Sequence, residues 1–224
     1  MPPRQRTNPS AQTRKRILDT AEKLFGERGV AAVSLRDINR AAGISQGVLH
    51  YHFGGREALI EAILLRTLPT VNAERRQIYD DVMASGRAPD ERDAAAILCL
   101  PLARLSLGKA AAGRRFLRCL ARLSQEQNPV WARVTREQMR DIALVELLQT
   151  YIPGCDRDHG RVEWTIEMAM NVIHSTLNGI GRPPLGWQSG LAANPMSAQQ
   201  QIDALMDFVC AGFRGVLVTA VADR

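Results

Sequence analysis

Apolar residues recur along this chain at the three- and four-residue spacing of an α-helix, and this periodicity limits its fold more than any other feature. Polar and apolar residues nowhere alternate for long enough to indicate a β-strand. No run of about 18 apolar residues is present that could cross a membrane, and the basic N-terminus leads into no apolar segment typical of an export signal. We therefore predict an all-α cytoplasmic protein with no membrane partner.

The N-terminal part of the chain predicts two helices in close succession. The first spans about residues 10–28 and stops at Gly29. Ser34 is placed to cap the second, with Asp37 three positions later as the acidic half of a capping box.

A tight turn leads from the second helix to a third. Gly43 suits this turn because the backbone must become left-handed there, and Ser45 is placed to cap a helix over residues 46–53. Helix, turn and short helix form a helix-turn-helix, whose second helix enters the major groove of DNA. We predict a DNA-binding domain over residues 1–55, with a basic tail over 1–9.

The positive charge of the chain is concentrated in the same region. The protein has 29 Lys and Arg against 23 Asp and Glu, a net charge of +6. Residues 1–66 hold eleven of the bases and six of the acids, which leaves the remaining 158 residues nearly neutral. A basic region of this kind favours a polyanionic partner such as DNA.

Residues 56–224 predict a larger, nearly neutral helical domain. Pro69 and Pro101 are expected to bend two of its helices, and a Gly/Pro-rich connection over 179–195 precedes the last one. The expected helices span residues 56–85, 90–108, 111–126, 129–152, 157–178 and 197–220.

The stretch "RILDTAEKLFGERGVAAVSLRDINRAAGISQGVLHYHFGGREALIEA" resembles the DNA-binding domain of the TetR family of transcriptional repressors over about 45 positions without a gap. The resemblance implies a homodimer on an operator with an inverted repeat. It also implies a variable, all-helical C-terminal domain for ligand binding and dimerisation, and repression that a small molecule relieves.

Three places depart from the commonest family pattern. Asn39 stands where a small alanine usually packs, and His50 stands where a tyrosine often reaches a phosphate. Gly55 and Arg56 replace a serine and a lysine, and both His50 and Arg56 keep the chemistry that a phosphate contact needs.

The candidate DNA contacts lie on the third helix and at the starts of the first two. Gln46 can read adenine through its amide, Gly47 lets the backbone approach the groove, and Tyr51 can contact a phosphate or a thymine methyl group. Arg4 and Arg6 in the tail are candidates for the minor groove. The full set is Arg14, Lys15, Arg16, Ser34, Arg36, Ser45, Gln46, Gly47, His50, Tyr51, His52 and Arg56.

A metal site at His50 and His52 is the alternative interpretation of this stretch. On a helix, positions two apart diverge by roughly 200°, so the two rings cannot bind one ion. We expect one histidine to be half-buried against Phe53 and the other to face DNA. The four cysteines show no CxxC pairing and are interpreted as reduced core residues, so no metal or cofactor is expected.

An effector pocket is expected among the middle helices, where polar residues interrupt apolar faces. Methionines and arginines together suit a hydrophobic molecule with an acidic end. The candidate residues are Arg104, Arg118, Arg122, Trp131, Met139, Trp164, Met168, Asn171 and His174.

Two segments near the C-terminus are apolar nearly all round and must be covered on two sides. We predict that they form a four-helix bundle with a second copy, and the alternative is a core within one chain. The interface candidates are Val162, Ile166, Ile173, Leu177, Leu205, Phe208, Val209, Gly212, Phe213 and Val216.

Two other functions compete with a ligand-responsive repressor. An enzyme is disfavoured because the chain has no dinucleotide fingerprint, phosphate-binding loop, HExxH motif or nucleophile elbow. A ligand-independent activator or architectural DNA-binding protein could use the same helices, but it has little need for the large neutral domain.

Overall fold

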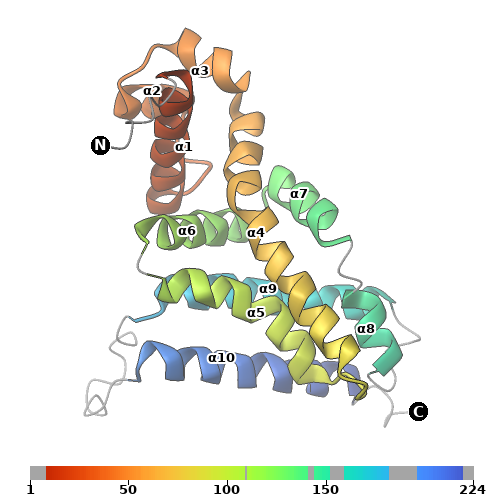
Figure 1. Cartoon of the computed structure of the whole chain (residues 1–224). Helices are drawn as coiled ribbons and strands as arrows, with labels where there is room; N and C mark the ends of the chain where they lie inside the picture. Colours follow the sequence, from red (N-terminus) through yellow and green to blue (C-terminus); the bar gives the residue numbers. More distant parts are fainter. Residues whose placement is uncertain (1–8, 109, 141–143, 152–158, 182–195, 219–224) are drawn as a thin grey trace, which may run out of the picture.

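The computed structural model describes residues 9–108, 110–140, 144–151, 159–181 and 196–218, and every regular element within these ranges is helical (Figure 1). The prediction of an all-α fold is confirmed. The helices are α1 (Pro9–Arg28), α2 (Leu35–Ala42), α3 (Gln46–Phe53), α4 (Arg56–Ala84), α5 (Glu91–Leu107), α6 (Ala111–Gln125), α7 (Pro129–Met139), α8 (Leu144–Tyr151), α9 (His159–Gly179) and α10 (Ala198–Phe213), which runs on into a π-helical segment (Arg214–Val218).

Helices α1, α2 and α3 gather at one end of the molecule, and α4 leads from them into a larger helical body (Figure 1). Helix α6 packs across the far end of α1, and α10 packs along α5. One continuous apolar core joins both regions, from Ile17 in α1 to Phe213 at the end of α10. The N-terminal helices therefore pack directly against the helical body.

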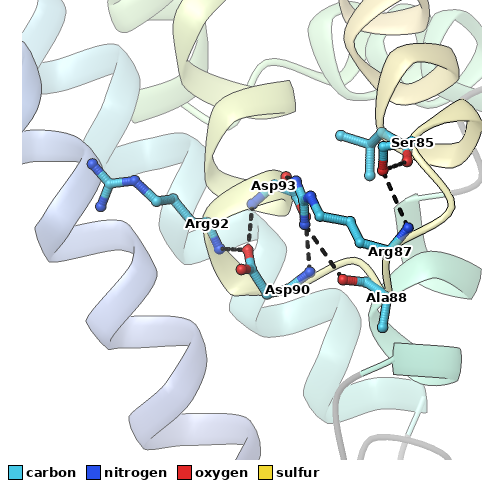
Figure 2. Close-up of polar contacts among 7 residues, drawn as sticks. Ser85, Arg87, Ala88, Asp90, Arg92 and Asp93 are labelled. Carbon is cyan, nitrogen blue, oxygen red and sulfur yellow. Dashed lines mark hydrogen bonds and ion pairs between the residues drawn. The ribbon is translucent and has the colours of Figure 1, made fainter.

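A polar network fixes the turn between α4 and α5 (Figure 2). The Asp90 carboxylate accepts hydrogen bonds from the backbone N–H groups of Arg92 and Asp93, at 2.9 and 3.1 Å. Burial opposes ionisation of Asp93, but hydrogen bonds from Arg87 outweigh it and lower the pKa of that carboxyl group. The Arg92 side chain turns outward and pairs with Asp207 of α10 at 2.9 Å, which ties the last helix to this corner.

Some local expectations needed correction. The single helix expected over residues 129–152 is present as α7 and α8, with residues 141–143 between them outside the described ranges. Pro69 and Pro101 lie inside α4 and α5, as expected, and the bends predicted at them stay predictions.

Two of the four cysteines, Cys99 and Cys119, are buried as expected, and burial raises the pKa of each thiol to about 12. Cys210 is half-buried, and Cys155 lies outside the described residues. Among the helices that the structure describes, none is both long and apolar enough to span a bilayer.

Candidate nucleic-acid interface

The start of α2 and the turn before α3 follow the sequence prediction. The Ser34 hydroxyl accepts a hydrogen bond from the Asp37 N–H at 3.2 Å, and the Asp37 carboxylate accepts one from the Ser34 N–H at 3.0 Å. Gly43 has φ 62° and ψ 44°, the left-handed conformation expected there. The capping box and the glycine turn are both confirmed, and together they set the direction in which α3 leaves α2.

One face of α3 packs on the core and the other lies open. Leu49 and Phe53 are buried, and Val48 is half-buried against the same cluster. The opposite face exposes Gln46, Gly47, His50 and Tyr51, whose side chain is 83% exposed. An aromatic ring that exposed on a helix of eight residues contributes little to folding and is available to a partner.

The two histidines separate as the helical geometry predicts. His52 is half-buried, with its ring centroid 6.2 Å from that of Phe53, whereas His50 is exposed. The expectation of one half-buried histidine is confirmed, and it is His52. Among the described residues, no group of three or more His, Cys, Asp and Glu side chains is arranged to hold a metal ion.

Ser45 occupies the N-cap position of α3 but does not cap it. Its backbone is extended, as at an N-cap, yet its hydroxyl accepts no hydrogen bond from the α3 backbone, which the structure describes in full. The predicted cap is therefore wrong in detail. The exposed hydroxyl and the first N–H groups of α3 remain available to an anion at the helix N-terminus.

Gly47 has no reason within the protein to be glycine. It lies inside α3, and a Cβ atom built on it would find the Ser45 Oγ at 4.0 Å as its nearest described neighbour. Alanine at this position would favour the helix by roughly 1 kcal/mol. Packing against the described residues therefore does not require glycine at this position.

The basic candidates of α1 and α2 are exposed, and one of them contacts α3. The Arg14 guanidinium lies over the Phe53 ring at 5.1 Å from its centroid, which places the start of α1 beside α3. Lys15 pairs with Asp19 at 2.6 Å, and Arg16 and Arg36 are exposed. The tail with Arg4 and Arg6 lies outside the described residues.

Arg56 differs from the other DNA-contact candidates because its guanidinium faces the protein. It donates to the carbonyl oxygens of Val33 and Val30 and lies 5.4 Å from the Phe25 ring centroid. The side chain thus fastens the start of α4 to the loop between α1 and α2. The sequence predicts a phosphate contact for Arg56, and in the structure its guanidinium is engaged by these two carbonyl groups.

Two profiles of known protein families match this chain. The profile of bacterial regulatory proteins of the tetR family matches residues 17–63, and that of the tetracyclin repressor-like C-terminal domain matches residues 96–212. The second match alone covers more than half of the chain. This chain belongs to the TetR family.

Individual relatives of this TetR-family chain are similar over part of their length. The transcriptional repressor KstR2 of Rhodococcus jostii (strain RHA1) is 38% identical over 85 residues, which cover 38% of this chain and 40% of the relative. The chain thus matches well under two thirds of that relative.

Solved structures agree in fold. PfmR of Thermus thermophilus has a TM-score of 0.52 at 20% identity, and the match covers 88% of this chain and 98% of PfmR. A SmeT–triclosan complex has a TM-score of 0.50 at 23% identity, with 89% and 90% covered.

Helix α6 contacts the DNA-binding region of this TetR-family chain through Glu126, the residue after its last turn. The Glu126 carboxylate accepts hydrogen bonds from the backbone N–H groups of Val30 and Ala31, both at 2.8 Å. Gly29, with φ +88°, lies so close that a Cβ atom would fall 2.7 Å from the Glu126 Oε1. The loop before α2 is therefore held directly by the helical body.

An ion-pair cluster adds a second link between the regions. Asp19 of α1 pairs with Arg66 of α4 at 2.7 Å and with Arg115 of α6 at 3.4 Å. Burial opposes ionisation of Asp19, but its bonds from Lys15 and Arg66 outweigh this and lower its pKa. Neither this cluster nor the Glu126 contact was predicted from the sequence, because both depend on residues more than 40 positions apart.

Two of the predicted effector residues, Trp131 and His174, contact each other through their rings in the described part of the chain. Both are buried, and their rings meet edge to face at 6.1 Å. Met139 and Met168 are half-buried, each on a different helix.

The remaining effector candidates lie in other places. Arg104 is exposed and pairs with Glu74 at 2.8 Å, and Arg118 sits where α6 crosses α1, its Cβ at 3.0 Å from a Cβ built on Gly26. Three more are exposed: Arg122, Trp164 and Asn171, the last accepting a hydrogen bond from Ser124. The structure therefore places Arg104, Arg122 and Trp164 on the surface of the protomer and Arg118 against α1. Helical spacing alone does not show which face a neighbouring helix covers.

The predicted dimer residues also divide into two groups. Six of them are buried within the protomer itself, so their burial needs no second copy: Val162, Ile173, Leu177, Leu205, Val209 and Phe213. Ile166 and Val216 are half-buried, Gly212 is exposed and Phe208 is 64% exposed. The alternative of an intrachain core therefore holds for the first group, and a surface for a partner remains for the second.

Proposed function

We propose that this TetR-family chain is a dimeric transcriptional repressor that inserts α3 into the major groove of an inverted-repeat operator and leaves DNA when a small effector binds its helical body. The observation that carries the proposal is the exposed Gly47 inside α3, which costs the free protein helix stability and is explained by close approach to DNA. The family assignment supports the same conclusion.

Each exposed group of the unit has a distinct role in this proposal. Gln46 and Tyr51 face the base edges, and Ser45 with the first N–H groups of α3 binds a phosphate. Contacts to the DNA backbone come, in this proposal, from Arg14, Lys15, Arg16, Ser34, Arg36, His50 and His52.

The dimer in this proposal forms through the surfaces of α9 and α10 that one protomer leaves open. Phe208 and Trp164 are 64% and 57% exposed, and Gly212 offers a place where a second helix can approach closely. Two-fold symmetry then places two copies of α3 about 34–36 Å apart, or a multiple of that distance.

Effector binding reaches α3 through helices α4 and α6 in this account. Arg56 fastens the start of α4 to the loop before α2, and Glu126 fastens the end of α6 to the same loop. A shift of either helix therefore moves the base of the recognition unit. SmeT, which is similar in fold, was solved in complex with the small molecule triclosan, and our proposal extends small-molecule binding to this chain.

A gel shift with the DNA upstream of the chain's own gene, repeated with a panel of metabolites, tests the proposal. We expect binding at least about a thousandfold tighter than to random DNA, lost when one metabolite is added. Equal affinity for random DNA would support an architectural protein instead. Specific binding that no metabolite weakens would support a ligand-independent regulator.

A further inference from the structure

Arg75 in the middle of α4 is a buried cation that pairs with no carboxylate of the described residues. Its side chain is 1% exposed and donates to Asn72 Oδ1 at 2.8 Å and, weakly, to the Leu98 carbonyl at 3.5 Å. Among the described residues no carboxylate pairs with it, and its Nε has no partner. Burial lowers the pKa of Arg75 to about 10, so it remains charged at neutral pH.

Buried polar atoms without partners in the described structure also lie on α9, which carries His174 near Arg75, and on α7, which packs against α4. His174 of α9 is buried, and burial and the nearby Arg75 lower its pKa to about 3, so it is neutral. Its Nδ1 and the Nε1 of Trp131, whose ring it contacts, find no hydrogen-bond partner among the described residues. Buried polar atoms are nearly always paired in a finished core.

Two more buried polar groups without partners among the described residues lie one turn further along α7 and α9. The Thr135 hydroxyl, one turn after Trp131 on α7, and the Asn178 carbonyl, one turn after His174 on α9, are also buried without a partner in the described structure. One buried charge and four polar groups unpaired within the described ranges are thus found on α4, α7 and α9. Such groups are typical of a site that a ligand completes.

We propose that Arg75 is the anchor of the effector site and that the effector is a small carboxylic acid with an apolar body. The carboxylate accepts two parallel hydrogen bonds from the guanidinium, including its unpaired Nε, and the body packs against Trp131. A monoanion is favoured over a phosphate dianion because the neutral His174 supplies no second charge. The inference rests on the proposed function for its regulatory meaning.

The position of Arg75 explains how such a ligand would act on DNA binding. Asn72, which accepts from Arg75, also donates to the Gln138 carbonyl at the end of α7, at 3.2 Å. A carboxylate at Arg75 competes for these donors and pushes on the contact between α4 and α7. Helix α4 carries this displacement to Arg56 and the loop that supports α3.

A binding experiment with matched acids and amides tests the site. Benzoate, octanoate and decanoate are compared with benzamide, octanamide and decanamide by calorimetry on the full chain, in wild type, Arg75→Met and Arg76→Met. The last is the control, because Arg76 is the adjacent residue on α4 but is exposed. If Arg75→Met fails to fold, Arg75→Gln, which keeps polar donors without the charge, takes its place.

We expect wild type and Arg76→Met to bind at least one acid about tenfold or more tightly than its amide, and Arg75→Met to lose that preference. We also expect ligand-free Arg75→Met to melt no lower than wild type, because an unneutralised buried charge is removed. No acid preference in wild type, or an equal preference in Arg75→Met, would overturn the inference.

A parallel gel shift separates this inference from the proposed function. An acid that binds through Arg75 without releasing DNA would support the carboxylate site. It would contradict the regulatory role of that site. If an uncharged or cationic metabolite releases DNA and calorimetry shows no preference for acids, the proposed function is supported. The inference that Arg75 binds a carboxylate is then contradicted.

Discussion

Gly47 and Arg75 are two described residues that packing within the protein does not explain, and they lie in opposite environments. Gly47 is on the open face of α3, where its backbone is bare. Arg75 is inside the helical body, where its charge is unneutralised. In our proposals, Gly47 faces a rigid surface outside the protein, whereas Arg75 binds a small molecule inside the helical body. A DNA reader and an effector site differ in this way.

The largest change in the free energy of unfolding is expected from Arg56→Ala. This variant tests whether the N-terminal helices, like the helical body with Arg75, contain an arginine that faces the protein interior. Removing the guanidinium leaves the carbonyls of Val33 and Val30 without their donors and should lower the free energy of unfolding by about 2–3 kcal/mol in urea denaturation. Arg36→Ala, at an exposed site of the same unit, is the control and should change it by less than about 0.5 kcal/mol. Equal losses in both variants would remove the distinction.

Gly47→Ala is expected to change folding and DNA binding in opposite directions. The added methyl group should stabilise the free protein by up to about 1 kcal/mol, because it meets no described atom closer than 4.0 Å. It should weaken operator binding by about tenfold or more, since it holds α3 away from the groove. Fluorescence anisotropy and urea denaturation measure the two effects. Unchanged affinity would mean that Gly47 does not lie against DNA.

Tyr51→Ala should weaken operator binding by about tenfold while leaving stability nearly unchanged, because its side chain is 83% exposed. Tyr51→Phe is the matched control. It retains affinity if the ring contacts a thymine methyl group and loses it if the hydroxyl contacts a phosphate. Wild-type affinity in both variants would place Tyr51 outside the interface.

Asn39→Ala should raise the free energy of unfolding by about 1 kcal/mol, since the Asn39 Oδ1 is buried with no partner among the described residues. Asn128→Ala is the contrasting control. Its side chain caps α7 by accepting from Val130 and Trp131, so its loss should cost about 1 kcal/mol. Destabilisation by Asn39→Ala would show that the side chain is satisfied in solution.

The smallest effect is expected on the pH dependence of the free energy of unfolding. The folded-state pKa of Asp19 is lowered, so the unfolded chain takes up a proton first as pH falls. The stabilisation from Asp19 is thus complete above the ordinary aspartate pKa and is lost as pH falls through the lowered one. Asp19→Asn should be less stable than wild type at neutral pH, and urea midpoints should converge in acid. A constant difference would contradict the role of its ion pairs.

The sequence was sufficient for features that depend on neighbours in the chain. Ser34 with Asp37, Gly43 and the open face of α3 all follow from spacing within a few residues. Ser45 was placed correctly at its N-cap position, but its missing hydrogen bond depends on a side-chain rotamer that spacing does not fix.

Features that depend on distant packing could not be predicted in the same way. Arg56 meets carbonyls 23 and 26 positions away, and the effector arginines were chosen without knowing which faces α1 would cover. Arg75 did leave a signal, because it continues the buried stripe of Leu68 and Val71 along α4 at helical spacing. A cation on an apolar stripe indicates a buried charge more strongly than a cation on a polar face.

The central claim is that two copies of α3 read an inverted repeat, and hydroxyl-radical footprinting of the upstream DNA tests it most directly. We predict two protected half-sites related by a dyad, with centres about 10 base pairs apart or a multiple of this. Protection of one asymmetric half-site by a monomer, or protection with no preferred position, would contradict the account.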